Sequence, residues 1–177
     1  MKVLRFIFAI SIYAGWYGCV YCGRKNLGWQ SLAFPIFSWV LLFQTLKPSV
    51  QDLKKIFIFL ILGVLFDFAS VHLGLITIAD QEKGIGLPVW LLSMWFVFAA
   101  SLPLLKTLFQ KRYFLSALMG ALFGPLSYYA GSKFEILFFN NQFTVAIYSV
   151  FWAVYLACAM YWLEPKKEAG SNAEKAN

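Results

Sequence analysis

Long apolar runs recur along almost the whole chain, and inside a bilayer a backbone satisfies its polar groups only as helices or as a closed barrel. A transmembrane helix needs about 20 apolar residues, whereas barrel strands are shorter and alternate in polarity. The continuous runs therefore predict an all-α, polytopic membrane helix bundle with about six transmembrane helices. The expected spans are Val3–Gly23, Trp29–Leu46, Ile56–Ile78, Pro88–Leu105, Phe114–Phe138 and Phe143–Leu163.

The composition agrees with one membrane domain. Of the 177 residues, 61% are hydrophobic and only 13% are charged, about half the charged share of a soluble domain. The connections between the runs are too short to fold separately, so we expect a transmembrane domain over residues 1–163. The polar segment 164–177 should be a disordered cytoplasmic tail. Because Asp67 in the third span has no counterpart in the sixth, we expect no internal repeat.

The net charge of +7 is distributed unevenly between the two sides of the predicted bundle. With the N-terminus inside, eleven of the 15 lysine and arginine residues lie in inner segments and four in outer loops. This bias follows the positive-inside rule and places both termini in the cytoplasm of a multi-pass protein. Because topology accounts for the charge, we expect no nucleic acid as partner. Membrane lipids are the expected partners, together with a second copy or another membrane protein.

Asp67 is the most informative single residue, because it stands in the middle of the apolar run Ile56–Ile78. A carboxyl group within the bilayer is costly unless protein or water surrounds it. Gly63, Ser70 and Gly74 share its helical face, and small residues there allow a neighbouring helix to approach closely. We therefore expect a buried carboxyl, protonated or hydrogen-bonded, in either a structural role or a role as a proton or ligand site.

The fifth span supplies the expected partner for Asp67. Its small and polar stripe consists of Ser116, Gly120, Gly124, Ser127, Tyr128 and Gly131. Gly120 and Gly124 form a Gly-x-x-x-Gly packing motif, and Pro125 should kink the helix and free the carbonyl of Ala121. The candidate buried polar site is therefore Asp67, Ser70, Ser127 and Tyr128. The expected helix-break and packing residues are Gly63, Gly74, Gly120, Gly124, Pro125 and Gly131.

Metal and redox chemistry have little support in the sequence. Cys19 and Cys22 form one Cys-x-x-Cys pair, but the pair lies in an apolar helix, and no second pair exists. The single histidine, His72, follows Asp67 by five residues, so the two side chains point to different faces of a helix. We expect no cofactor and no metal site.

Several of these residues together resemble a known family, the bacterial polytopic inner-membrane proteins grouped as domain of unknown function 2878. The resemblance covers nearly the whole chain before the tail and implies a helical fold in the bacterial inner (plasma) membrane, with no established activity. The residues that carry it are Trp16, Gly63 with Asp67, Pro88-x-Trp90, Trp95-x-x-Phe98-Ala99-x-x-Leu102 and Gly120-x-x-x-Gly124-Pro125-x-x-Tyr128-x-x-Gly131.

Three classes of function remain open from the sequence. The first, which the sequence favours, is a non-catalytic membrane module that supports envelope or lipid homeostasis. The second is a small proton-linked or solute permease that uses Asp67. The third is a lipid-modifying intramembrane enzyme, for which the chain offers no nucleophile–base pair and no metal cluster. The identity of any catalytic residue stays unknown, and the balance is against catalysis.

Overall fold

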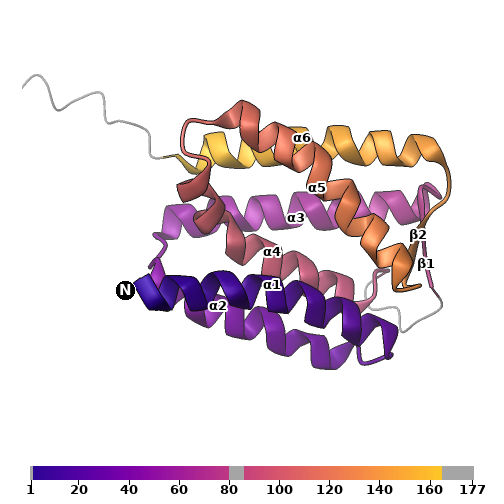
Figure 1. Cartoon of the computed structure of the whole chain (residues 1–177), viewed down its shortest axis with the longest axis horizontal. Helices are drawn as coiled ribbons and strands as arrows, with labels where there is room; N and C mark the ends of the chain where they lie inside the picture. Colours follow the sequence, from indigo (N-terminus) through magenta and orange to yellow (C-terminus); the bar gives the residue numbers. More distant parts are fainter. Residues whose placement is uncertain (1, 80–85, 165–177) are drawn as a thin grey trace, which may run out of the picture.

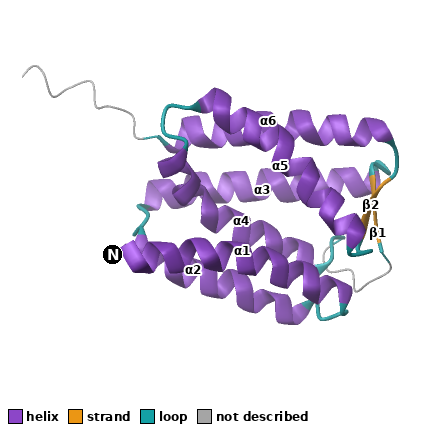
Figure 2. Cartoon of the chain, viewed as in Figure 1, coloured by secondary structure: helices purple, strands orange, loops and turns teal. Residues whose placement is uncertain are grey.

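The computed structural model describes residues 2–79 and 86–164, which form a helical bundle (Figure 1, Figure 2). The prediction of an all-helical fold is confirmed, with one small two-stranded sheet added at one end. In chain order the elements within these residues are α1 (Lys2–Arg24), η1 (Trp29–Leu32), α2 (Ala33–Thr45), α3 (Val50–His72), β1 (Ile76–Ile78), α4 (Val89–Leu108), α5 (Tyr113–Lys133), β2 (Leu137–Phe139) and α6 (Gln142–Leu163).

The two ends of the bundle differ in structure. The start of α1 and the end of α6 lie at one end, and the strands lie at the other (Figure 1). There β1 pairs with β2 in antiparallel register, with Thr77 opposite Phe138 at the centre of the ladder. Arg24, the last residue of α1, forms an ion pair of 2.7 Å with Glu135 in the turn before β2. The strand end is therefore closed by backbone pairing between β1 and β2 and by one surface ion pair.

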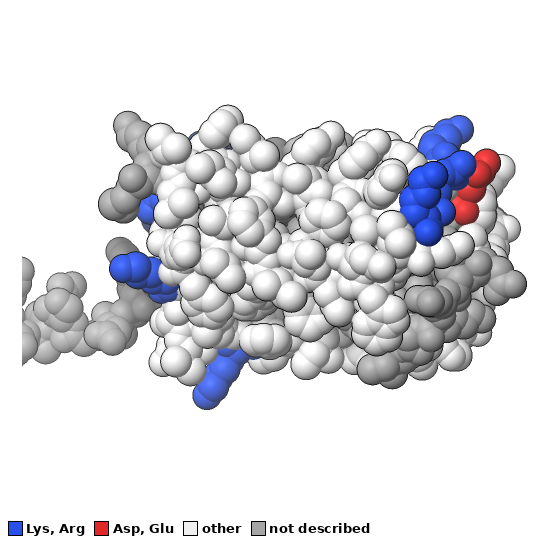
Figure 3. Space-filling view, turned by 90° about the horizontal axis from the view of Figure 1, so that it is seen from below, with Lys and Arg blue, Asp and Glu red and all other residues white. Residues whose placement is uncertain are grey.

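Among the described residues, four helices are long and apolar enough to cross a membrane: α1, α3, α4 and α6. Of the other two, α2 has only 13 residues after the four-residue turn η1, and α5 is 21 residues long but carries several glycine and serine residues. Figure 3 shows charged side chains at the two ends of one face and an uncharged band between them. Such a band matches the hydrocarbon of a bilayer, so the chain is a multi-pass membrane protein.

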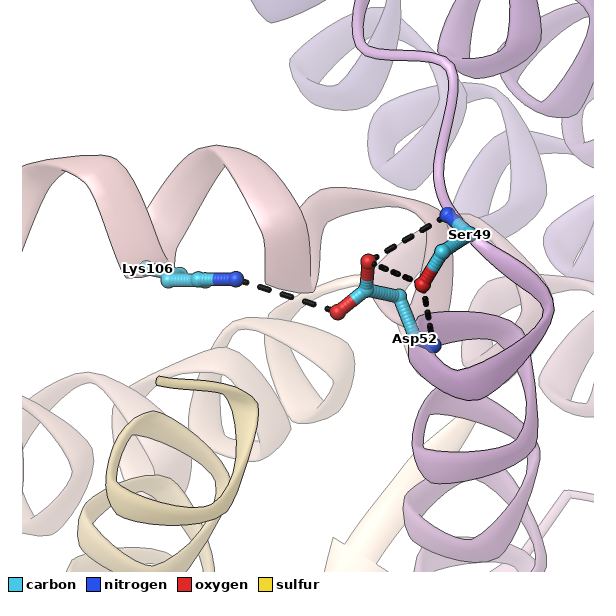
Figure 4. Close-up of polar contacts among 3 residues, drawn as sticks. All are labelled: Ser49, Asp52 and Lys106. Carbon is cyan, nitrogen blue, oxygen red and sulfur yellow. Dashed lines mark hydrogen bonds and ion pairs between the residues drawn. The ribbon is translucent and has the colours of Figure 1, made fainter. Parts of the chain in front are cut away.

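The third helix begins and ends earlier than predicted. It starts at Val50 because Ser49 and Asp52 form a capping box, with the Ser49 hydroxyl accepting from the Asp52 amide at 3.1 Å. Asp52 also lies 3.8 Å from the amine of Lys106 on α4 (Figure 4). At the other end α3 stops at His72. Asp67 is therefore five residues from the end of its helix, and the prediction that it stands at the centre of its span is wrong.

The prediction that Gly74 packs a helix is also wrong, and α5 continues through Pro125. Gly74 follows α3, has a φ of +67° and has no neighbour within 4 Å of an added Cβ, so it shapes the turn into β1 instead of packing a helix. Pro125 lies inside α5, which runs without interruption from Tyr113 to Lys133. A proline removes one amide hydrogen, but α5 does not end at Pro125. The kink at Pro125 and the free carbonyl of Ala121 stay predictions.

The expectation of no internal repeat is wrong as well, because α3–β1–α4 resembles α5–β2–α6. Both first helices end in the same way: Leu75 donates to the carbonyl of Ser70, and Ile136 donates to the carbonyl of Gly131. Between those bonds Gly74 and Glu135 both have positive φ values, of 67° and 59°. The strand ladder is symmetric about its centre. The α3–β1 and α5–β2 segments are therefore related by an approximate local two-fold axis through the ladder.

Equivalent positions in α3 and α5 are separated by 61 residues, the spacing from Asp67 to Tyr128. At this spacing Gly63 corresponds to Gly124, and both are buried. The repeat was not predicted from the sequence, because the third span was compared with the sixth, whereas each repeating unit contains two helices. Chemically different side chains at Asp67 and Tyr128 also conceal the equivalence.

The end of α6 is held to the turn between α4 and α5. Glu164 accepts hydrogen bonds from the Tyr113 hydroxyl at 2.5 Å and from the Lys111 amide at 2.6 Å. These two bonds hold the pKa of Glu164 below its ordinary value, because they stabilise the charged form. Of the predicted tail, residues 165–177 lie outside the described residues.

Candidate functional site

Asp67 is fully buried and accepts hydrogen bonds from three other helices. The indole Nε1 of Trp95 on α4 donates to Oδ2 at 2.7 Å. The Tyr128 hydroxyl on α5 lies 2.7 Å from Oδ1 and 2.9 Å from Oδ2. The Tyr148 hydroxyl on α6 makes a longer contact of 3.4 Å with Oδ1. The carboxyl group of α3 therefore links all four helices of the repeated core.

Two glycines bring the donors to Asp67. A Cβ on Gly63, one turn before Asp67, would overlap the six-membered ring of Trp95. A Cβ on Gly124, one turn before Tyr128, would overlap the indole of Trp152. These matching contacts let the two indoles stack, with ring centroids 5.3 Å apart and planes within 2°. The repeat therefore places a pair of tryptophans between its two halves. The position of the Trp95 ring directs its N–H toward the carboxyl group of Asp67.

The surroundings of Asp67 hold donors and apolar groups. Each of the three donors is neutral, and Tyr128 and Tyr148 stack edge-to-face with centroids 4.5 Å apart. His72 turns away: its Nδ1 lies 2.8 Å from the carbonyl of Phe68, on the same helix. In the described residues no group of three or more His, Cys, Asp and Glu could hold a metal ion. The arrangement can accept or release a proton at Asp67, or it can lock four helices together.

A cavity of about 340 Å³ begins beside this cluster. It lies between α1 and α4 on one side and α5 and α6 on the other, and Trp95, Tyr128 and Trp152 form part of its wall. The remaining lining residues are mostly apolar: Trp16, Met94, Phe98, Leu105, Phe109, Met119, Gly120, Phe123, Gly124, Ser127 and Leu156. Its volume falls within the range of about 300–1,000 Å³ that is usual for small-molecule sites.

The internal repeat explains why the cavity exists. Between α3 and α6 the equivalent space is filled, since Phe66 stacks on Phe151 at 3.5 Å and Phe59 meets Tyr155 at 5.4 Å between ring centroids. In α5 the corresponding positions are Ser127 and Gly120, and both line the cavity. Two aromatic rings of the first half are therefore replaced by small residues in the second half, and the space they would occupy stays open.

The structure brings together only part of the candidate site predicted from sequence. Asp67 and Tyr128 are in contact, whereas Ser127 donates within its own helix to the carbonyl of Gly124 at 2.6 Å. Ser70 is buried one turn beyond Asp67. The partners of Asp67 are instead the three side-chain donors Trp95, Tyr128 and Tyr148. Gly120 and Gly124 pack on α6, not on α3.

Trp95 and Tyr148 were missed by sequence reasoning. Both lie in apolar runs, where an aromatic residue is usually assigned to packing. The available signal was chemical, because a buried indole or phenol needs a hydrogen-bond partner, and Asp67 is an acceptor inside the predicted spans.

Comparison with known proteins identifies one family. A family model described as "Protein of unknown function (DUF2878)" matches residues 5–158, which include all of the residues around Asp67. No curated protein and no solved structure matches the chain.

Proposed function

The chain belongs to the DUF2878 family of proteins of unknown function, and from that premise we propose a function on the geometry of its site. The protein is a non-catalytic membrane module that holds the apolar chain of a membrane lipid between α1, α4, α5 and α6, in support of envelope or lipid homeostasis. The observation that carries the proposal is the apolar cavity beside Trp95 and Tyr128.

Three features of the cavity support a lipid occupant. Its lining comes from helices whose outer faces carry exposed apolar side chains such as Leu122 and Leu126 on α5, so lipid surrounds it. Its far end reaches Leu105 and Phe109, next to the basic turn with Lys111 and Arg112. Basic residues at the membrane surface attract anionic headgroups. A lipid with its chain in the cavity would thus place its headgroup beside this turn.

Filling the cavity should abolish lipid occupancy without unfolding the protein. Ser127→Phe restores the ring that Phe66 supplies in the first half of the repeat. We expect labelling of Met94 and Met119 by a phosphatidylethanolamine with a photoreactive acyl chain to fall about tenfold or more, which corresponds to about 1.4 kcal/mol. Labelled peptides would be quantified by mass spectrometry after purification in detergent.

Ser132→Phe is the matched control, because it lies on the same helix and also replaces a hydroxyl that bonds three residues back, to Tyr129 at 2.7 Å. It lies outside the residues that line the cavity, so it should label as the wild type does. Undiminished labelling of Met94 and Met119 in a folded Ser127→Phe protein would contradict the proposal.

Orientation is part of the proposal. The excess of lysine and arginine on one side supports a bacterial inner membrane with both termini in the cytoplasm. Truncated reporter fusions after Lys47 and Lys111 should therefore report the cytoplasm, and a fusion after Asn140, beside β2, should report the periplasm. The measurement is the activity ratio of paired reporters that function on opposite sides of the membrane. An inverted pattern at two of the three sites would overturn this topology.

A second candidate function is a proton-linked permease. Parallel repeats related by an axis along the membrane normal occur in transporters, with coupling groups at the repeat interface, and Asp67 occupies that position here. Proteoliposomes with an internal pH-sensitive dye would distinguish the two functions. Proton flux that is lost in a normally folded Asp67→Asn protein would favour the permease, and equal flux in both proteins would exclude Asp67 as the carrier.

A further inference from the structure

The space between α1 and α5 is closed at the strand end of the bundle. Arg24, the last residue of α1, donates a hydrogen bond of 2.7 Å to the carbonyl of Phe134, directly after α5. The ring of Tyr17 meets Phe134 edge-to-face, with centroids 5.7 Å apart. Nearby, the buried side chains of Val20 and Ile136 line a space of only about 10 Å³. An acyl chain therefore finds no passage between the two helices at this end.

Toward the other end of the bundle α1 and α5 separate. Figure 1 shows α5 running obliquely, from its start beside α6 to its end near α1. The 340 Å³ cavity lies where they separate, with Trp16 of α1 and Met119 of α5 in its wall. Phe123 also lines the cavity, although its side chain is 60% exposed. Among the described residues, the cavity therefore opens sideways, beside Phe123, onto the surface that faces lipid.

The depth of the cavity restricts which leaflet can supply a lipid. Its lining extends from Tyr128, which contacts Asp67, to Leu105 and Phe109 next to the basic turn between α4 and α5. Basic residues at the membrane surface attract the phosphate of a lipid. A lipid of the opposite leaflet would have to bring its phosphate to the depth of Tyr128 to fill the same space, and a charge there is costly.

The side opening also decides how much of a lipid enters. A phospholipid has two acyl chains on one glycerol group, and an enclosed cavity would have to accept or exclude both. Because the opening beside Phe123 faces the hydrocarbon, one chain can enter while its neighbour stays among other lipids. The mostly apolar lining suits a chain and gives no polar partner set for a headgroup inside the cavity.

We propose that one acyl chain of a phospholipid enters this cavity sideways, between α1 and α5, from the leaflet at the end of the bundle where α1 begins. The methyl end of the chain lies near Tyr128, its carboxyl end lies near Phe109, and the second chain stays in the bilayer beside Phe123. With the topology proposed above, this is the cytoplasmic leaflet. The inference rests on the proposed lipid-binding function and adds the source leaflet and the entrance.

The direction of insertion is tested with two phosphatidylethanolamines that differ only in the place of a diazirine, near the carboxyl carbon or at the methyl end of one chain. Wild-type protein in liposomes is irradiated with each lipid, and labelled residues are quantified by mass spectrometry. We expect the methyl-end probe to favour Met94 over Phe109, and the carboxyl-end probe to favour Phe109, each by about tenfold. A carboxyl-end probe that does not favour Phe109 would overturn the inferred leaflet.

The entrance is tested by blocking it from outside. In a Cys158→Ser background, which lacks the exposed native cysteine, Phe123→Cys or Leu122→Cys is coupled to a pyrene maleimide. Leu122 is the matched control, because it is 55% exposed on the same helix but lies outside the cavity lining. Pyrene at position 123 should lower labelling of Met94 by the methyl-end probe about tenfold, and pyrene at position 122 should leave it within about twofold.

The outcomes separate the entrance from the function. Equal labelling of Met94 in the two pyrene-coupled proteins would overturn the side entrance, even where both probes insert in the expected direction. Absence of labelling in the wild-type cavity by either probe would instead contradict the proposed lipid-binding function.

Discussion

Replacement of Asp67 by leucine is expected to destabilise the protein more than any other single substitution in the core. It leaves the Trp95 indole N–H and the Tyr128 hydroxyl buried without their acceptor, and it removes the longer contact with Tyr148. Each unsatisfied donor costs about 1–3 kcal/mol in a protein interior, and the cost per bond is smaller in membranes. We expect a total loss of about 3 kcal/mol, measured by reversible denaturation in mixed micelles.

The comparison variants for this prediction are Asp67→Asn, Tyr128→Phe and Trp95→Phe. Asparagine keeps one carbonyl oxygen as acceptor, so its loss should be well below that of leucine. Each aromatic variant removes one donor and should cost about 1 kcal/mol. Wild-type stability of Asp67→Leu would show that the carboxyl group does not hold the four helices together.

The second large effect is expected at Gly120, where α5 meets the backbone of α6. An added Cβ would lie 2.8 Å from the carbonyl carbon of Trp152 and closer still to its oxygen. Backbone atoms cannot rotate away as a flexible side chain can, so the two helices must separate. We expect Gly120→Ala to lose about 2 kcal/mol, which is typical of overpacking, and to lower the yield of folded protein and the thermal midpoint in detergent.

Gly131→Ala is the matched control for Gly120→Ala. It is the same change on the same helix, but the nearest atom to its Cβ, in Leu137, is 3.6 Å away, an ordinary contact distance. Gly131→Ala should therefore stay close to the wild type, and the difference between the two variants isolates the close approach of α5 to α6. If the two variants unfold at the same temperature, the packing of Gly120 against Trp152 contributes nothing.

The link between Asp67 and the fifth helix could be predicted, because it depends on local periodicity. Gly63 and Asp67 lie four residues apart, as do Gly124 and Tyr128, so each pair shares one helical face. Apolar runs likewise predict the helices, since the bilayer permits few alternatives. Where the predicted bounds of the third helix failed, the cause was also local. Because of the capping box at Ser49 and the left-handed turn at Gly74, α3 begins and ends about one and a half turns earlier in the chain than predicted.

The sequence by itself determined that this chain is a helical membrane protein, that Asp67 is buried and that small residues accompany it. These properties follow from hydrophobicity and from spacing within one helix. Only the tertiary structure decided that Trp95 and Tyr148 donate to Asp67 and that Ser127 and Gly120 leave a cavity where Phe66 and Phe59 fill one. Those contacts depend on how each helix is rotated and shifted against its neighbours, and in a bilayer nearly all faces are apolar enough to meet either lipid or protein.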